Sequence, residues 1–166
     1  MQLEPVKTLR GTVRIPADKS ISHRAVMFGA LANGTTRIEN CLLSADCRST
    51  ISCFSQMGIS ISVDEATNTV LVNGKGLHGL NVPDAVLNTG NSGTTTRLMS
   101  GILVGQSFSS TLSGDASLNS RPMKRIMTPL SQMGADIISV NGNDCAPLAI
   151  SPHPLLGIHY HSPIAS

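Results

Sequence analysis

The sequence has almost no aromatic residues: Phe, Tyr and Trp make up 2% of its 166 residues, and Trp is absent. The core must therefore be built from Leu, Ile, Val, Ala and Met, packed closely where glycine lets backbones approach. Runs of Lys or Arg are also missing, and the formal net charge is only +2. Because nucleic-acid surfaces combine basic patches with aromatic platforms, we expect a small-molecule partner and no nucleic acid.

Membrane-spanning segments and metal-binding patterns are missing as well. No apolar run approaches the roughly 20 residues that a spanning helix needs, and the N-terminus lacks an apolar signal-peptide core, so we expect a cytoplasmic protein with no membrane partner. The four cysteines lack C-x-x-C spacing and are interpreted as reduced thiols: Cys41, Cys47, Cys53 and Cys145. The segment His159-Tyr160-His161 has no third ligand at a fitting spacing, and we expect no metal.

A short repeat organises the chain. The tetrapeptide Ser-Gln-Met-Gly occurs at 55–58 and again at 131–134, each time between a helix-like stretch and an alternating strand pattern. This repeat predicts two copies of one βαβαββ unit, at about 12–76 and 85–151. The length of 166 residues suits one domain with a substantial core.

Hydrophobic periodicity and turn residues place the elements of each unit. The first unit is predicted to contain a strand, a helix, a strand, a helix and two strands, at 12–15, 20–31, 36–39, 46–57, 59–64 and 70–72. The elements predicted in the second are a helix, a strand, a helix and two strands, at 93–104, 109–112, 122–133, 137–140 and 148–150. The leading helices are apolar nearly all round at 25–31 and 98–104, which is typical of helices buried inside sheets. We therefore predict an α/β (α+β) fold, an inside-out barrel-like domain with buried helices and outer sheets.

The segment Asp18-Lys19-Ser20-Ile21-Ser22-His23-Arg24 places two cations and two hydroxyls where an extended stretch becomes a helix. Free N–H groups and the positive end of the helix dipole favour negative charge there. Lys19 and Arg24 strengthen that preference, which indicates a phosphate or carboxylate site. The alternative is a pair of solvated charges, although cations are uncommon beside the positive end of a helix dipole.

Two more predicted helix starts carry a similar combination: Asn91-Ser92-Gly93-Thr94 with Arg97, and Ser120-Arg121-Pro122 with Lys124. Taken singly, the first is also explained as a turn and cap, and the second as a surface arginine before a proline-started helix. The fourth helix start differs, because Asp46 supplies the acid that normally complements a helix N-terminus. If the repeats stack side by side, the three cationic starts line one cleft that holds more than one negative group.

With these loops assembled, the chain resembles the N-terminal part of the 3-phosphoshikimate 1-carboxyvinyltransferase (5-enolpyruvylshikimate-3-phosphate synthase) family. The resemblance covers nearly all of the chain, and the matching segments are 18–25, 90–98, 114–115 and 120–123. In that family two domains, each of three βαβαββ units, close over shikimate 3-phosphate and phosphoenolpyruvate. The resemblance implies that residues 1–166 supply two of six units and that the C-terminal portion of the same enzyme is their partner.

The resemblance also implies roles for individual residues. Those implied in binding shikimate 3-phosphate are Lys19, Ser20, Arg24 and Ser166, the last as the first residue of a Ser-x-Gln motif. Those implied in binding phosphoenolpyruvate are Lys19, Asn91, Gly93 and Arg121. Because Lys19 would face both substrates, the resemblance makes it the catalytic residue.

The implied reaction joins the shikimate 5-hydroxyl to C2 of phosphoenolpyruvate, protonates C3 and then releases phosphate, with no metal or cofactor. In the family the acid/base Asp and Glu belong to the missing portion, so we expect the chain alone to be inactive and its parent to be a monomer. One alternative is the related UDP-N-acetylglucosamine enolpyruvyl transferase, which usually has Lys-Asn in the first loop and a reactive cysteine in a mobile loop. This chain has Lys19-Ser20 and no cysteine within 117–121. The other alternative is a non-catalytic anion-binding domain.

Overall fold

The computed structural model describes residues 8, 10–13 and 15–163. The elements that precede residue 80 are α1 (Lys19–Leu31), β1 (Asn33–Ile38), α2 (Ala45–Gln56), β2 (Ser60–Asp64) and β3 (Thr69–Lys75). Those that follow are β4 (Leu87–Asn88), α3 (Gly93–Leu103), β5 (Ser110–Ser113), the 3-10 helix η1 (Leu118–Ser120), α4 (Lys124–Gln132), β6 (Asp136–Ser139) and β7 (Leu148–Ser151). Within the described ranges, no helix has the length and apolar character needed to cross a membrane.

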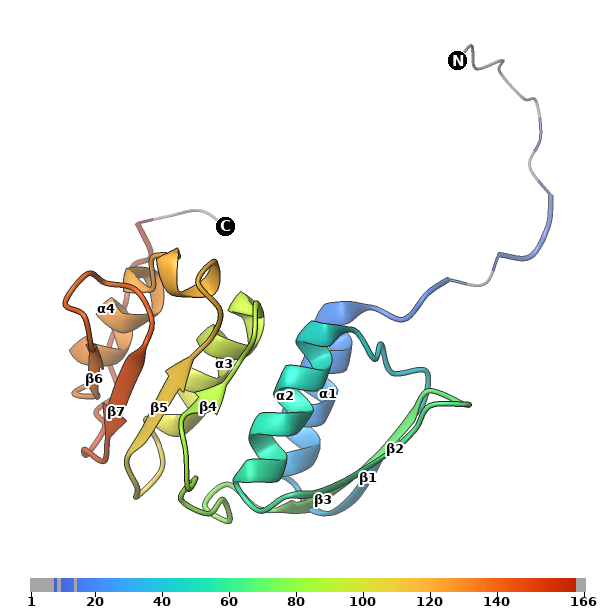
Figure 1. Ribbon diagram of the computed structural model, residues 1–166, viewed down its shortest axis with the longest axis horizontal. Helices are drawn as coiled ribbons and strands as arrows, with labels where there is room; N and C mark the ends of the chain where they lie inside the picture. Colours follow the sequence, from blue (N-terminus) through green and yellow to red (C-terminus); the bar gives the residue numbers. More distant parts are fainter. Residues whose placement is uncertain (1–7, 9, 14, 164–166) are drawn as a thin grey trace.

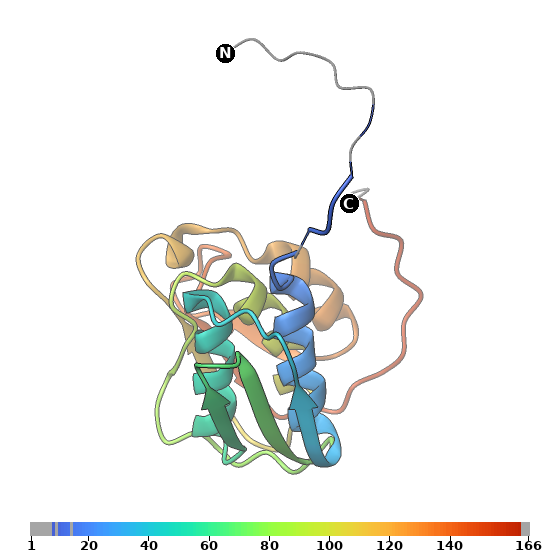
Figure 2. The same cartoon turned by 90° about the vertical axis from the view of Figure 1, so that its right-hand side faces the viewer.

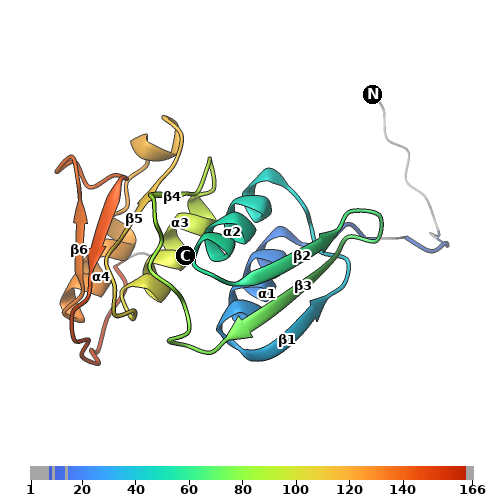
Figure 3. The same ribbon diagram turned by 60° about the horizontal axis from the view of Figure 1, so that its bottom comes forward.

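Two sheets form the outer layers. The first has the strand order β1-β3-β2 and is antiparallel throughout, and the second has the order β4-β5-β7-β6 with a parallel β4–β5 pair. Helices α1, α2 and α3 lie between the sheets (Figures 1 and 3), and α4 contacts β6 and α3. Viewed from the outer face of the first sheet, α1 and α2 run side by side behind it (Figure 2). The predicted inside-out arrangement of buried helices and outer sheets is confirmed.

The core is aliphatic and sulfur-rich, as the composition predicts. Its largest fully buried side chains include one aromatic ring, Phe54, together with Met57, Met99, Leu103 and Leu112. Glycine brings backbones close where α1 meets β3, because a Cβ on Gly74 would lie 2.2 Å from the carbonyl oxygen of Gly29. Small residues thus replace aromatic bulk at the contact between helix and sheet.

One predicted element is wrong, and another begins two residues later than predicted. The strand expected at 12–15 is not present in its described residues, because extended backbone becomes a strand only beside a hydrogen-bonding partner. Val13 and Ile15 are 77% and 75% exposed. Helix α4 begins at Lys124 and not at Pro122, because Pro122 forms an antiparallel bridge with Cys145, and the following residue, Met123, donates its N–H to a loop carbonyl. The two-residue strand β4 is the leading strand of the βαβαββ unit predicted at about 85–151, although no residue range was predicted for it.

The leading helices are covered on one side only in the described part of the chain. Val26 and Met27 of α1 and Met99 of α3 are buried, whereas Phe28 and Leu98 are 68% and 40% exposed. Both helices therefore have an apolar face that the described residues leave uncovered, whereas their nearly uniform apolar sequence predicted burial on all sides.

Candidate anion-binding site

The site begins at the N-terminus of α1. The Asp18 carboxylate accepts a hydrogen bond from the N–H of Ile21 at 2.7 Å, and this cap starts the helix at Lys19. Lys19, Ser20 and Arg24 are exposed on the first two turns. The Lys19 ammonium lies 3.0 Å from Asp46 Oδ2, whereas the Arg24 guanidinium has no hydrogen-bonding or ionic partner within the described residues. This helix start therefore retains donors for an external anion.

Asp46 connects the starts of three helices. Ser44 caps α2, so the prediction that Asp46 merely complements this helix end is incomplete. The Asp46 carboxylate pairs with Lys19 of α1, while its backbone carbonyl accepts from the hydroxyl of Thr95 in α3 at 3.3 Å. Because the Lys19 and Asp46 side chains are 51% and 28% exposed, the ion pair is weak, and a bound anion can compete for the ammonium.

The loop before α3 is held from a distant part of the chain. The Asn91 side-chain amide donates to both carboxylate oxygens of Asp115, at 3.0 and 2.7 Å. Arg121 donates to the side-chain oxygen of Asn91, to its backbone carbonyl at 3.3 Å and to the hydroxyl of Ser117 at 3.3 Å. The hydrogen bonds from Asn91, and next the N–H of Leu118, lower the pKa of the Asp115 carboxyl. Asn91 and Arg121 therefore belong to one ordered cluster.

Gly93 is needed for the close approach of two guanidinium groups. A Cβ at this position would lie 2.7 Å from Arg97 Nη1 and 3.4 Å from Arg121 Nη1. Arg97 also donates to the carbonyl of Pro122 at 3.4 Å. The first helical turn of α3 thus combines free backbone N–H groups with two cations, which is an arrangement suited to a phosphate or carboxylate.

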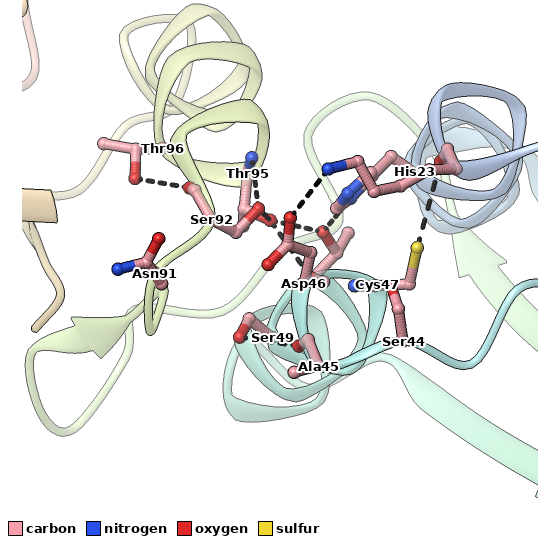
Figure 4. Close-up of polar contacts among 12 residues, drawn as sticks. His23, Ser44, Ala45, Asp46, Cys47, Ser49, Asn91, Ser92, Thr95 and Thr96 are labelled. Atoms are coloured by element: carbon pink, nitrogen blue, oxygen red, sulfur yellow. Dashed lines mark hydrogen bonds and ion pairs between the residues drawn. The ribbon is translucent and has the colours of Figure 1, made fainter. Parts of the chain in front are cut away.

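The predicted residues fall into two groups. Asn91, Gly93 and Arg121 lie together, whereas Lys19, Ser20 and Arg24 lie on α1, which Asp46 connects to α3. Figure 4 shows Asp46 between His23 of α1 and Ser92 and Thr95 of α3, with Asn91 in the adjoining loop. Arg121 is at the C-terminal end of η1 and not at the start of α4 as predicted. Ser166 lies outside the described residues.

Sequence reasoning missed the acceptors that hold these side chains. Asp46 and Asp115 were not identified as partners of Lys19 and Asn91, because 27 and 24 residues separate the members of each pair. Local patterns do not reveal such pairings. In the segments described here, no three His, Cys, Asp or Glu side chains group in a way that would hold a metal ion.

Comparisons with known proteins show which sequences this chain is similar to. Residues 3–166 match the family model described as EPSP synthase (3-phosphoshikimate 1-carboxyvinyltransferase). The 3-phosphoshikimate 1-carboxyvinyltransferase of Bacillus subtilis is 51% identical over all 166 residues, which cover 38% of its length. The Bacillus thuringiensis protein of the same name is 54% identical over 99% of this chain and 38% of its own.

Solved structures extend the comparison. EPSP synthase from Acinetobacter baumannii superposes with a TM-score of 0.89 at 44% identity, over 94% of this chain and 36% of that one. The enolpyruvyl transferase NikO from Streptomyces tendae shares the fold, with a TM-score of 0.55 at 18% identity over 83% of this chain and 28% of its own. The chain thus spans a little over a third of the length of the relatives it matches. Because the family model matches nearly the whole sequence, this chain belongs to the EPSP synthase (3-phosphoshikimate 1-carboxyvinyltransferase) family.

Proposed function

We propose that this chain forms the N-terminal part of an enzyme that transfers the enolpyruvyl group of phosphoenolpyruvate to the 5-hydroxyl of shikimate 3-phosphate. The hydroxyl loses its proton as its oxygen bonds to C2 of phosphoenolpyruvate, and C3 takes up a proton as the C2–C3 double bond becomes single. The tetrahedral intermediate then expels phosphate, with loss of a proton from C3. The family match and the identity with the curated relatives support this reaction.

The two groups of site residues take the two substrates. Shikimate 3-phosphate binds at the start of α1, through Lys19, Ser20 and Arg24, with Ser166 as a further ligand. Phosphoenolpyruvate binds at the start of α3, through Asn91, Gly93 and Arg121. Lys19 contacts both substrates and is the catalytic residue of this half of the site. No metal or cofactor takes part.

The observation that best supports the proposal is that Lys19 and Arg24 have little or no pairing with carboxylates in the described residues. Each of the three site carboxylates already accepts from a donor: Asp18 from Ile21, Asp46 from Lys19 and Asp115 from Asn91. Arg24 is unpaired within the described residues, and Lys19 has only a partly exposed ion pair. Fixed cations beside helix N-termini stabilise two polyanions held side by side, and they also stabilise the charge that develops on the departing phosphate.

The domain organisation belongs to the same proposal. The described elements β4 to β7 follow the order βαβαββ, apart from η1, and α1 to β3 follow the order αβαββ. We assign these to two of six units, at about 85–151 and 12–76. The exposed apolar faces of α1 and α3, around Phe28 and Leu98, are where the remaining part of the enzyme packs. The four buried cysteines are free thiols, which suits a cytoplasmic enzyme. In this proposal the enzyme is a monomer.

A chimaera tests the proposal. This chain replaces the matching 38% of the Bacillus subtilis relative, and phosphate release from phosphoenolpyruvate is measured with and without shikimate 3-phosphate. We expect release that depends on both substrates. The control is the relative without its N-terminal part, which should be inactive. A chimaera that unfolds cooperatively on heating, and is therefore folded, and yet releases no phosphate would contradict the proposal.

A further inference from the structure

A chain of buried hydrogen bonds runs behind the exposed ion pair. His23 Nδ1 of α1 lies 2.7 Å from the Thr50 hydroxyl of α2, which lies 2.8 Å from the Thr95 hydroxyl of α3. The Thr95 hydroxyl donates to Ser92 Oγ at 2.7 Å, and the same serine oxygen caps α3. All four side chains are fully buried or nearly so, and Figure 4 shows His23, Thr95 and Ser92 facing one another across the three helices. We call this series of hydrogen bonds, from His23 through Thr50 and Thr95 to Ser92, the relay.

The acceptors around Thr95 favour one direction for the hydrogen bonds of the relay. The Thr95 hydroxyl has one proton, and it donates this proton to two acceptors, Ser92 Oγ and the Asp46 carbonyl. Either hydroxyl of the Thr50–Thr95 pair could be the donor by distance alone. We assign Thr50 as the donor because Thr95 already serves these two acceptors, and the Thr50 oxygen then accepts from His23. His23 is then neutral, with its proton on Nδ1.

The other ring nitrogen agrees with this assignment. His23 Nε2 is buried and has no hydrogen-bond partner within the described part of the chain. An unpaired acceptor is tolerated inside a protein more readily than an unpaired N–H, so the lone pair belongs on Nε2. Burial also lowers the pKa of His23, which keeps the ring neutral.

We propose that the relay is a positioning device that fixes the Asn91–Gly93 loop relative to Lys19 and so sets the distance between the two anion sites. The inference rests on the proposed function, because that function makes these two loops the substrate ligands. The exposed connection through Lys19 and Asp46 cannot keep this distance when a substrate draws Lys19 away. The relay is buried and does not involve Lys19, so it persists when both sites are filled.

Three variants of the chimaera separate positioning from stability. Thr50→Val removes the central hydroxyl with little change in shape, and Thr50→Ser restores it. Thr96→Val is the matched control, because the buried Thr96 hydroxyl contacts Thr89 and the Ser92 carbonyl and lies outside the relay.

We expect Thr50→Val to lower kcat/KM for phosphoenolpyruvate about tenfold, since ~1 Å of misplacement costs up to ~100-fold. Thr50→Ser should stay within about twofold of the parent, and kcat/KM for shikimate 3-phosphate should change less. Equal losses in Thr50→Val and Thr96→Val would overturn the inference.

Two readouts on the 166-residue chain do not depend on turnover. Nitrogen NMR of labelled histidine should show His23 protonated at Nδ1 and unprotonated at Nε2. Hydrogen exchange should show that Thr50→Val speeds exchange at both 19–23 and 91–95, whereas Thr96→Val affects only the second segment. A ring protonated at Nε2 would overturn the assigned direction of the hydrogen bonds. Unchanged exchange at 91–95 in folded Thr50→Val would overturn the relay itself, even if the chimaera is active. If the chimaera is inactive but both readouts hold, the proposed function fails and the buried connection stands.

Discussion

The starts of α1 and α3 have corresponding places in the repeated pattern, yet their polar side chains are held in opposite ways. At α1 the cations are nearly free, with one exposed ion pair at Lys19 and no partner for Arg24 in the described ranges. At α3, Asn91 is held between Arg121 and Asp115. The same backbone pattern therefore has an adaptable cationic site at the start of α1 and an ordered site at the start of α3.

The difference has an energetic meaning. Ordering a lysine or arginine side chain on binding costs up to about 2 kcal/mol in rotamer freedom. At α1 the side chains become ordered only when the ligand binds, so this cost lowers the affinity. At α3 hydrogen bonds within the protein order the side chains before the ligand binds. Changes at α1 should therefore act by removing charge, and changes at α3 should act by displacing groups that are already in place.

The largest expected effect is at the adaptable site. Lys19→Met in the chimaera should lower turnover at least roughly 10²- to 10³-fold, because one electrostatic contact to the transition state is lost. Its melting temperature should change little, since the side chain is half exposed. Lys75→Met, the same change at an exposed lysine at the end of β3, is the control. Near-normal turnover in Lys19→Met would remove the catalytic role.

A smaller effect is expected at the ordered site. Gly93→Ala places a methyl group 2.7 Å from Arg97 Nη1, so the flexible guanidinium must move. We expect KM for phosphoenolpyruvate to rise about tenfold, by the same sensitivity to ~1 Å shifts, with a smaller change in kcat. Gly101→Ala on the same helix meets no atom within 4 Å and should leave KM unchanged. Equal KM values for the two variants would show that α3 is as adaptable as α1.

Acid should loosen the ordered site. The pKa of Asp115 in the folded chain lies below its ordinary value of 3.8, chiefly through the Asn91 hydrogen bonds. Its stabilising contribution is complete above that value and is lost as the pH falls through the lower, folded pKa. The side-chain amide resonance of Asn91 should therefore shift as the pH falls below about 4.

Asp115→Asn should show no such shift. Asp64→Asn is the matched control, because hydrogen bonds from Thr67 and Ala66 lower the pKa of Asp64 far from this cluster. It should keep the Asn91 shift. An Asn91 resonance that stays constant down to pH 2 would mean that Asp115 does not hold the loop.

The smallest effect concerns the outer face of α1. Phe28 is 68% exposed, so Phe28→Ser should change the unfolding free energy of the 166-residue chain by less than about 1 kcal/mol. We expect the unchanged chain to self-associate through this apolar face and the variant to do so less, as measured by light scattering. Leu77→Ser, at a loop residue that is 65% exposed, should not alter association. A monomeric unchanged chain at high concentration would contradict the expectation.

The boundaries of most elements could be predicted because their signals are local. Asp18 and Ser92 each cap a helix through the N–H of a residue three positions later, and the alternation of Ile61 and Val63 with polar neighbours marks β2. The errors occur where a distant partner decides. Residues 12, 13 and 15 lack a neighbouring strand in the described part, and the pairing of Pro122 with Cys145 delays the start of α4.

The sequence by itself determined which residues carry charge at each helix start, because capping and the helix dipole act within a few residues. It also determined the close packing of small residues that an aromatic-poor core requires. Only the tertiary structure decided which cations are paired and which stay free. Lys19 meets Asp46 across 27 residues and Arg121 meets Asn91 across 30, so these pairings depend on how the helices pack between the two sheets. The buried relay has the same origin, since three helices each supply part of it.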